Sequence, residues 1–185
     1  MGALGDQLRQ DHDDIRTIVA VLIEVASRLD AEQPVAPEDL QRLIDYADTF
    51  VRQMHHGKEE TILFPALEAS GVQRENGPLE VMTAEHELES NFITGLAGAA
   101  RRYLVGDKSA APVMAEYARD YAAVLTRDMD QEDQTLIPIA EERLPQAVQD
   151  DLARKFVALE TEVLGPDRHT KYHDIARDLA QRYLN

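Results

Sequence analysis

The sequence predicts an all-α protein, namely an antiparallel up-down-up-down four-helix bundle with two additional C-terminal helices. Residues that favour helices, notably Ala, Leu, Glu and Arg, are common, whereas runs of β-branched residues are scarce. Apolar residues recur at the spacing of one helix face in several long segments, and prolines or glycines separate these segments. A chain of 185 residues is long enough to enclose one sizeable core.

Prolines mark the limits of the long amphipathic segments. Pro37 and Pro112 lie where the second and fourth segments begin, and proline is favoured in the first turn of a helix. Pro65 and Pro138 lie near the ends of the same two segments, where each removes a backbone donor and should kink or interrupt the helix. The four long helices are expected at about residues 6–29, 37–69, 79–104 and 112–143.

Two shorter helices are expected after these four. One spans about residues 145–164 and ends before the helix-breaking pair Gly165-Pro166, and the other spans about residues 167–184. The expected domain organisation is a four-helix bundle at residues 1–143 and a C-terminal helical extension, packed on the bundle, at residues 144–185.

The long segments contain a two-fold internal repeat. The sequence EETILFPA at residues 59–66 resembles EDQTLIPI at residues 132–139, and DHD around His12 resembles EHE around His86. Two helical hairpins that carry the same markers at the same places predict a pseudo-symmetric bundle with one site between its halves.

The charge and composition exclude several classes of function. The net charge is −16, with 35 acidic and 19 basic residues, so phosphate backbones and anionic membrane surfaces would repel the chain. Neither nucleic acid nor a membrane is therefore expected as a partner. The absence of cysteine excludes disulfides, thiolate zinc sites, iron–sulfur clusters and cysteine nucleophiles. The sequence shows neither a signal-peptide pattern nor an apolar run of roughly 20 residues, so we expect a cytoplasmic protein.

Ionisable side chains occupy the predicted inner faces of all four long helices. His55 and Glu59 are four residues apart, as are Asp128 and Glu132, so each pair lies on one side of its helix. Asp128 falls at the centre of the apolar stripe of the fourth helix. The candidate metal ligands are His12, His55, Glu59, His86, Asp128 and Glu132.

The same helical projection separates His55 and Glu59 from their neighbours. His56 and Glu60 fall roughly opposite the apolar stripe of the second helix, and we expect both to point away from the core. Variants in which either is replaced by Ala are therefore expected to retain the metal.

Buried carboxylates must be neutralised, paired with a cation or bound to a metal, because an unpaired buried charge costs several kcal/mol. No Lys or Arg falls clearly on the inner faces near Asp128 and Glu132. Three imidazoles and three carboxylates at matching levels suit a metal such as iron. A single histidine on an apolar face is more often a hydrogen-bonded core residue, but the repetition of the whole pattern favours a metal.

These motifs resemble those of the hemerythrin-like family, also called HHE cation-binding domains. The family pattern is a histidine on the first helix, HxxxE on the second, a histidine on the third and HxxxE on the fourth. It corresponds here to His12, HHGKE at residues 55–59, His86 and DMDQE at residues 128–132, and the resemblance covers about residues 5–143. The resemblance implies two non-haem iron ions, bridged by carboxylates and by an oxo or hydroxo group. It also implies a role in O2 binding, redox or NO sensing, or iron homeostasis.

Asp128 departs from the family pattern, which usually has histidine there. Aspartate can bind iron, but it is shorter and anionic, and this favours redox chemistry or one weakened metal position over reversible O2 carriage. Glu89, one turn from His86, can compensate either as a ligand or as an acceptor for an imidazole N–H group. Tyr117 and Tyr121 share the helix face of Asp128. Each is either a core aromatic residue or a group that acts at the metal, as a hydrogen-bond donor, a redox-active group or a ligand.

His169 and His173 form a second possible metal pair on the last helix, although the lack of matching carboxylates favours a solvated or packing face. Three functions stay open at this point. The first is a module whose two iron ions bind O2, NO or peroxide, or sense iron or redox state. The second is a di-iron enzyme with oxidase, peroxide-decomposing or NO-reducing activity. The third is a structural bundle that holds zinc or no metal.

Overall fold

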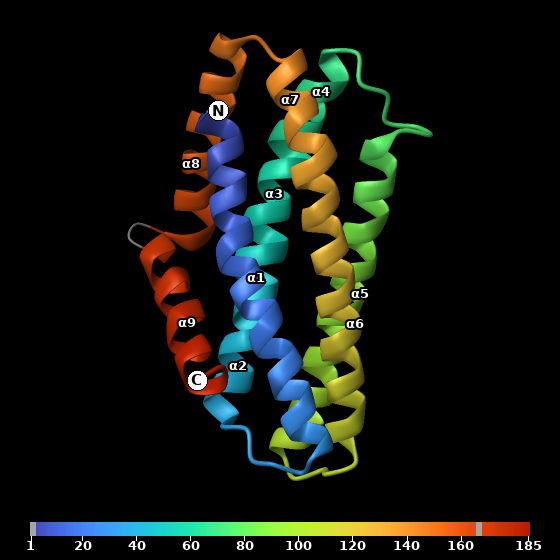
Figure 1. Cartoon of the computed structure of the whole chain (residues 1–185), viewed down its shortest axis with the longest axis vertical. Coiled ribbons are helices and arrows are strands. Elements are labelled where there is room, and N and C mark those ends of the chain that lie inside the picture. The colour runs from blue at the N-terminus through green and yellow to red at the C-terminus, as the bar shows by residue number, and fades with distance from the viewer. Residues whose placement is uncertain (1–2, 166–167) are drawn as a thin grey trace.

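The computed structural model describes residues 3–165 and 168–185, which form helices joined by short links (Figure 1). No β-strand occurs within these two ranges, so the predicted all-α class is confirmed. The first and third long segments are α1 (Ala3–Asp30) and α5 (Pro78–Leu104). The C-terminal helices are α8 (Gln146–Leu164) and α9 (Arg168–Tyr183).

The second and fourth long segments are continuous but contain stretches of π-helix. The second segment consists of α2 (Pro37–Asp45), η1 (Tyr46–His55), α3 (His56–Lys58), η2 (Glu59–Leu63) and α4 (Phe64–Ala69). The fourth consists of α6 (Ala110–Gln131), η3 (Glu132–Leu136) and α7 (Ile137–Arg143).

Pro65 and Pro138 were expected to kink or interrupt their helices, and at each of them the helix changes from π to α. Each proline lies in the first turn of an α-helix that directly follows a π-helix, η2 in one half and η3 in the other. A proline cannot donate to the carbonyl four residues earlier, and the wider i→i+5 pattern accommodates this missing bond without ending the helix. The internal repeat therefore extends to the backbone.

Successive long segments run in opposite directions along the longest axis (Figure 1). The links at residues 31–36 and 105–109 lie at one end, and the link at residues 70–77 lies at the other. Gly71 and Gly106, with φ angles of 94° and 97°, follow α4 and α5 in the left-handed region that favours glycine. Helix α6 packs against both α1 and α5.

The apolar core is divided into two clusters along the axis. One contains Leu4, Phe64 and Leu136, and the other contains Ile15 and Leu125. In every long segment a candidate ligand lies between residues of the two clusters, namely His12, His55, Glu59, His86 and Glu132, whereas Asp128 directly precedes Met129 of the second cluster. A polar layer therefore separates the two parts of the core.

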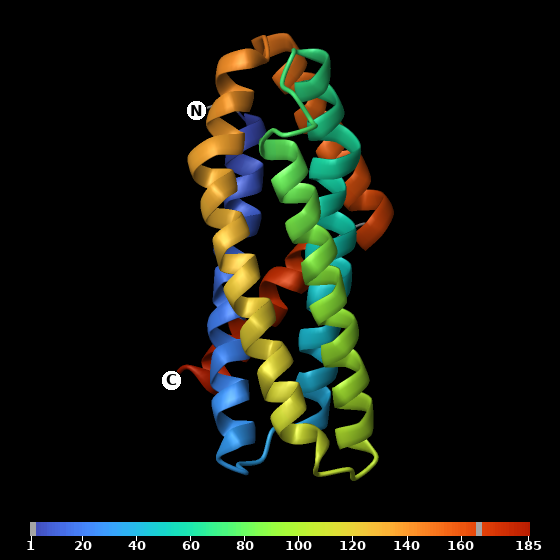
Figure 2. The ribbon, with the colours of Figure 1, turned by 90° about the vertical axis from the view of Figure 1, so that its right-hand side faces the viewer.

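Helices α8 and α9 lie along one flank of the molecule (Figures 1 and 2). Helix α8 contacts α1, η1, α3 and η2, and α9 contacts mainly α1. The division of the chain at residue 143 stays a prediction. None of the described helices is long and apolar enough to cross a membrane.

Candidate metal centre

Histidine and carboxylate side chains from all four long segments converge in the polar layer. They come from α1, from the stretch that joins η1 to η2, from α5, and from the junction of α6 and η3. Potential donor atoms within each of two groups lie within 4.8 Å of one another. The first group is His12, His55, Glu59 and Glu132, and the second is His56, His86 and Asp128.

The carboxylates of Glu59 and Glu132 lie between the two groups. Glu132 Oε2 is 3.0 Å from His12 Nε2 and 3.8 Å from His55 Nε2. Glu132 Oε1 is 3.6 Å from His86 Nε2, and Glu59 Oε2 is 3.5 Å from the same nitrogen. Both carboxylates belong to the first group and also lie close to His86 of the second group. A carboxylate that binds two cations must approach both groups of ligands in this way.

The second group is built around His86. His86 Nε2 is 3.4 Å from Asp128 Oδ2, and the His86 ring stacks on the ring of His56, with centroids 3.9 Å apart and an interplanar angle of 6°. His56 Nε2 is 3.3 Å from Glu89 Oε2. The structure therefore brings all six predicted ligands together and adds His56 and Glu89 to the cluster.

The expected orientation of His56 was wrong, because its side chain is buried in the cluster. The projection assumed 3.6 residues per turn, whereas the ten residues before His56 form the π-helix η1, whose i→i+5 bonds need more residues per turn. The helix therefore turns less over η1 than the projection assumed. The repeat held a usable signal, since Met129 is the counterpart of His56, and an apolar residue at that position indicates burial.

The atoms that face one another in the cluster lack hydrogen-bond partners. Among the described residues, no hydrogen bond reaches the Nε2 atoms of the four histidines or either oxygen of the four carboxylates. All eight side chains are buried, the most exposed being His86 at 4%. Buried polar atoms are normally hydrogen-bonded or bound to a metal, and imidazole nitrogens with carboxylate oxygens fit a transition metal such as iron. The eight residues are His12, His55, His56, Glu59, His86, Glu89, Asp128 and Glu132.

The comparison with protein families agrees with this chemistry. The family model of the hemerythrin HHE cation binding domain matches residues 4–140. The chain belongs to this family. The match includes every residue of the cluster, whereas α8 and α9 lie outside it. No curated protein and no solved structure matches the chain.

Outer carboxylates orient His12 and His86 in this hemerythrin-family site. The Nδ1 atom of His12 donates to Asp133 Oδ1 at 2.9 Å, and that of His86 donates to Glu60 Oε1 at 2.7 Å. These two contacts are equivalent in the internal repeat. Glu60 is exposed, as expected, but it holds a histidine of the cluster. Such a bond fixes the tautomer that leaves Nε2 free to bind a metal.

A buried lysine near the hemerythrin-family site was not predicted. The Nδ1 atom of His55 lies 3.3 Å from Asp11 Oδ2, and the same oxygen accepts a 2.8 Å hydrogen bond from Lys58 Nζ. Lys58 Nζ is also 3.3 Å from Glu160 Oε2 on α8. Helix α8, which lies outside the family match, therefore reaches His55 through Glu160, Lys58 and Asp11. None of the ion pairs between described residues joins a Lys or Arg to Asp128 or Glu132, as expected.

Burial and neighbouring charges shift the pKa values of the carboxylates in opposite directions. Burial and the neighbouring Glu132 raise the pKa of Asp128 to about 7, and the same two causes raise the pKa of Glu59 well above its usual value. Burial also opposes ionisation of Glu132, but contacts with three imidazoles hold its pKa well below the usual range. Despite burial, the hydrogen bond to Asp133 raises the pKa of His12 to about 9.

The remaining candidates lie in different surroundings. The Tyr121 hydroxyl is buried with no hydrogen-bond partner among the described residues, and burial and the nearby Glu89 raise its pKa well above the usual value. Tyr117 instead packs on Gly95, where an added Cβ would lie 2.4 Å from the ring, and it also contacts the ring of Phe92. Tyr117 is thus a packing residue in the contacts that the structure describes.

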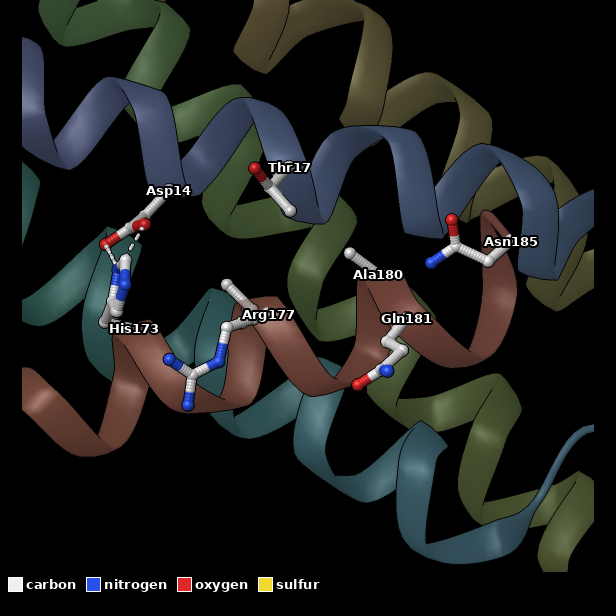
Figure 3. A pocket seen from close by; sticks show the side chains of 8 residues that line it. Asp14, Thr17, His173, Arg177, Ala180, Gln181 and Asn185 are labelled. Carbon is white, nitrogen blue, oxygen red and sulfur yellow. Dashed lines mark hydrogen bonds and ion pairs between the residues drawn. The ribbon is translucent and has the colours of Figure 1, made fainter.

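His173 lies at a pocket of about 550 Å³ between α1 and α9 (Figure 3). Its Nδ1 atom is 2.9 Å from Asp14 Oδ1, so the ring belongs to a contact between the two helices. The side chain of His169 lies outside the described residues. The His173 side chain is 52% exposed, so the predicted alternative of a solvated face fits it.

Proposed function

We propose that this chain is a di-iron protein of antiparallel four-helix topology, in which His12, His55, Glu59, His86, Asp128 and Glu132 hold the metal. The observation that supports this proposal is the cluster of buried Nε2 and carboxylate oxygen atoms without hydrogen-bond partners. Hydrogen-bonded outer carboxylates, as at His12 and His86, are the usual partners of metal-binding histidines.

The charges in the cluster support two ions. Glu59, Glu89, Asp128 and Glu132 carry four negative charges when ionised, and two divalent cations balance them if the histidines stay neutral. One divalent cation would balance only two of these charges, so the other two carboxylates would have to stay protonated or pair with a protonated imidazole. Structural zinc sites usually use four ligands, so a larger donor set of nitrogen and oxygen favours iron.

The burial of the cluster supports a small ligand. Every side chain in it is at most 4% exposed, so O2, NO or peroxide fits better than an organic substrate. Iron, when bound, supplies the capacity to take up such ligands and to exchange electrons with them. We infer that the protein handles one of these molecules, or senses iron or redox state, in the cytoplasm and without nucleic acid or membrane partners.

A di-iron enzyme is the second candidate function. Tyr121 favours it, because a fully buried phenol beside Glu89 and Asp128, with no hydrogen-bond partner among the described residues, can supply an electron and a proton during turnover. The activity would be that of an oxidase, or the decomposition of peroxide or the reduction of NO.

An optical titration tests the function and separates the two candidates. The iron-loaded protein should show a ferric absorption band that changes on addition of O2, NO or peroxide, whereas the iron-free protein should show neither. A spectral change with little loss of peroxide supports binding or sensing, and repeated consumption of peroxide supports the enzyme. A protein that takes up iron but whose spectrum responds to none of the three molecules would contradict both.

A further inference from the structure

The internal repeat allows the two halves of the site to be compared position by position. His12 corresponds to His86, and Glu59 corresponds to Glu132. At the remaining position His55 corresponds to Asp128, so the second half has one imidazole fewer. If the two halves were otherwise alike, the position near His86 would be the poorer in nitrogen donors.

Two further core positions also differ between the halves. Glu89 corresponds to Ile15, and His56 corresponds to Met129. All four side chains are buried. The first half of the chain has Ile15 and His56 at these positions, and the second half has Glu89 and Met129. Each half thus supplies one additional polar side chain, and the two meet beside His86 and Asp128. The replacement of a histidine coincides with two additional donors at the same end of the cluster.

The geometry directs both additional donors to the second group. The His56 ring stacks on His86 with centroids 3.9 Å apart, and His56 offers a ring nitrogen within 4.8 Å of donor atoms of His86 and Asp128. His56 Nε2 is 3.3 Å from Glu89 Oε2. Neither this nitrogen nor either oxygen of Glu89 has a hydrogen-bond partner in the described part of the chain.

We propose that His56 and Glu89 are direct ligands of the metal position that also contains His86 and Asp128, where they replace the missing family histidine. This inference rests on the proposed function. The ligand is a divalent transition-metal cation, and His56 comes from the second helical segment rather than from the fourth, where the family pattern has its histidine. The shortened Asp128 side chain then leaves room for the imidazole of His56.

An isolated contact between His56 and Glu89 explains these observations less well. A buried ion pair is stable only if hydrogen bonds satisfy its remaining polar atoms. Here the pair is not aligned as a hydrogen bond, and both oxygens of Glu89 lack a partner among the described residues. A cation between His56, His86, Asp128 and Glu89 would satisfy all of these atoms at once.

The test replaces each residue by its counterpart in the internal repeat, His56→Met together with Glu89→Ile. Because Met129 and Ile15 are buried at the equivalent positions, this variant should fold. Metal-free protein is titrated anaerobically with Co²⁺, and the ions bound per chain are counted by calorimetry and elemental analysis. His173→Met is the matched control, since His173 contacts Asp14 outside the cluster.

Wild type and the control should bind two ions, and the double variant should bind one. Loss of a residue that only hydrogen-bonds to a ligand typically weakens metal binding by about 10–100-fold. If His56 and Glu89 are direct ligands, the affinity for the second ion should fall by more than this factor. Two ions with unchanged affinity in the double variant would overturn the inference and leave the proposed function intact. Fewer than two ions in wild type would overturn the proposed function itself. If the double variant does not fold, the single variants His56→Gln and Glu89→Gln decide the question by the same criterion.

Discussion

Replacing Glu132 by Gln should remove both metal ions. Its two oxygens face different groups, since Oε2 is 3.0 Å from His12 Nε2 and Oε1 is 3.6 Å from His86 Nε2. Glutamine keeps the shape of the side chain but loses its charge and one of its two acceptor oxygens. We expect elemental analysis to show well below one iron atom per chain.

The same variant should also destabilise the metal-free protein. Contacts with His12, His55 and His86 hold the pKa of Glu132 low against the effect of burial, so Glu132 is the counter-ion of the imidazoles. Removing one partner of a buried ion pair costs about 3–5 kcal/mol, and urea denaturation measures this loss. Glu116→Gln is the matched control, because Glu116 is an exposed glutamate of α6, the helix that ends directly before Glu132. Retention of both iron atoms in Glu132→Gln would show that Glu132 does not join the two groups.

Replacing Asp128 by Leu should have the opposite effect on the metal-free protein. Asp128 is buried in a carboxylate-rich cluster, and burial together with Glu132 raises its pKa to about 7. A buried acid with poor partners is destabilising, so an apolar side chain of similar size should raise the melting temperature. The variant should also bind one metal ion rather than two, because it loses a donor of the second group.

The pH dependence of this gain in stability follows from the raised pKa. A carboxyl group whose folded pKa lies above its unfolded value keeps its contribution to stability at low pH and loses it as the pH rises to the folded pKa. Wild type therefore loses this contribution between about pH 4 and pH 7, whereas Asp128→Leu does not. The difference in melting temperature between metal-free Asp128→Leu and wild type should grow over this range. A variant that retains two ions and melts at a higher temperature would show that Asp128 is not a ligand.

The sequence was sufficient to predict the elements of the fold that depend on local patterns. The limits of α1, α5 and α8 agree closely with the expected helices because proline, glycine and apolar spacing act over a few residues. The repeat and the four-residue spacings also indicated which ionisable residues would meet. The structure brings all six candidate ligands together in two adjoining groups.

The features that the sequence did not reveal depend on helix geometry and on distant contacts. The π-helix η1 changes the register before His56, and an ideal helical projection cannot include that change. Lys58 is buried because Asp11 on α1 and Glu160 on α8 both approach it, and neither contact is visible in a single segment. The opposite pKa directions of Asp128 and Glu132 likewise depend on how many imidazoles each one contacts.

The iron content of the wild-type protein tests the central claim most directly. The protein should be purified anaerobically, supplied with excess ferrous iron, freed of unbound metal and analysed for iron and zinc. Two buried groups of imidazoles and carboxylates predict two iron atoms per chain and no significant zinc. Zinc alone, or no bound metal, would contradict the account of this site as a di-iron centre.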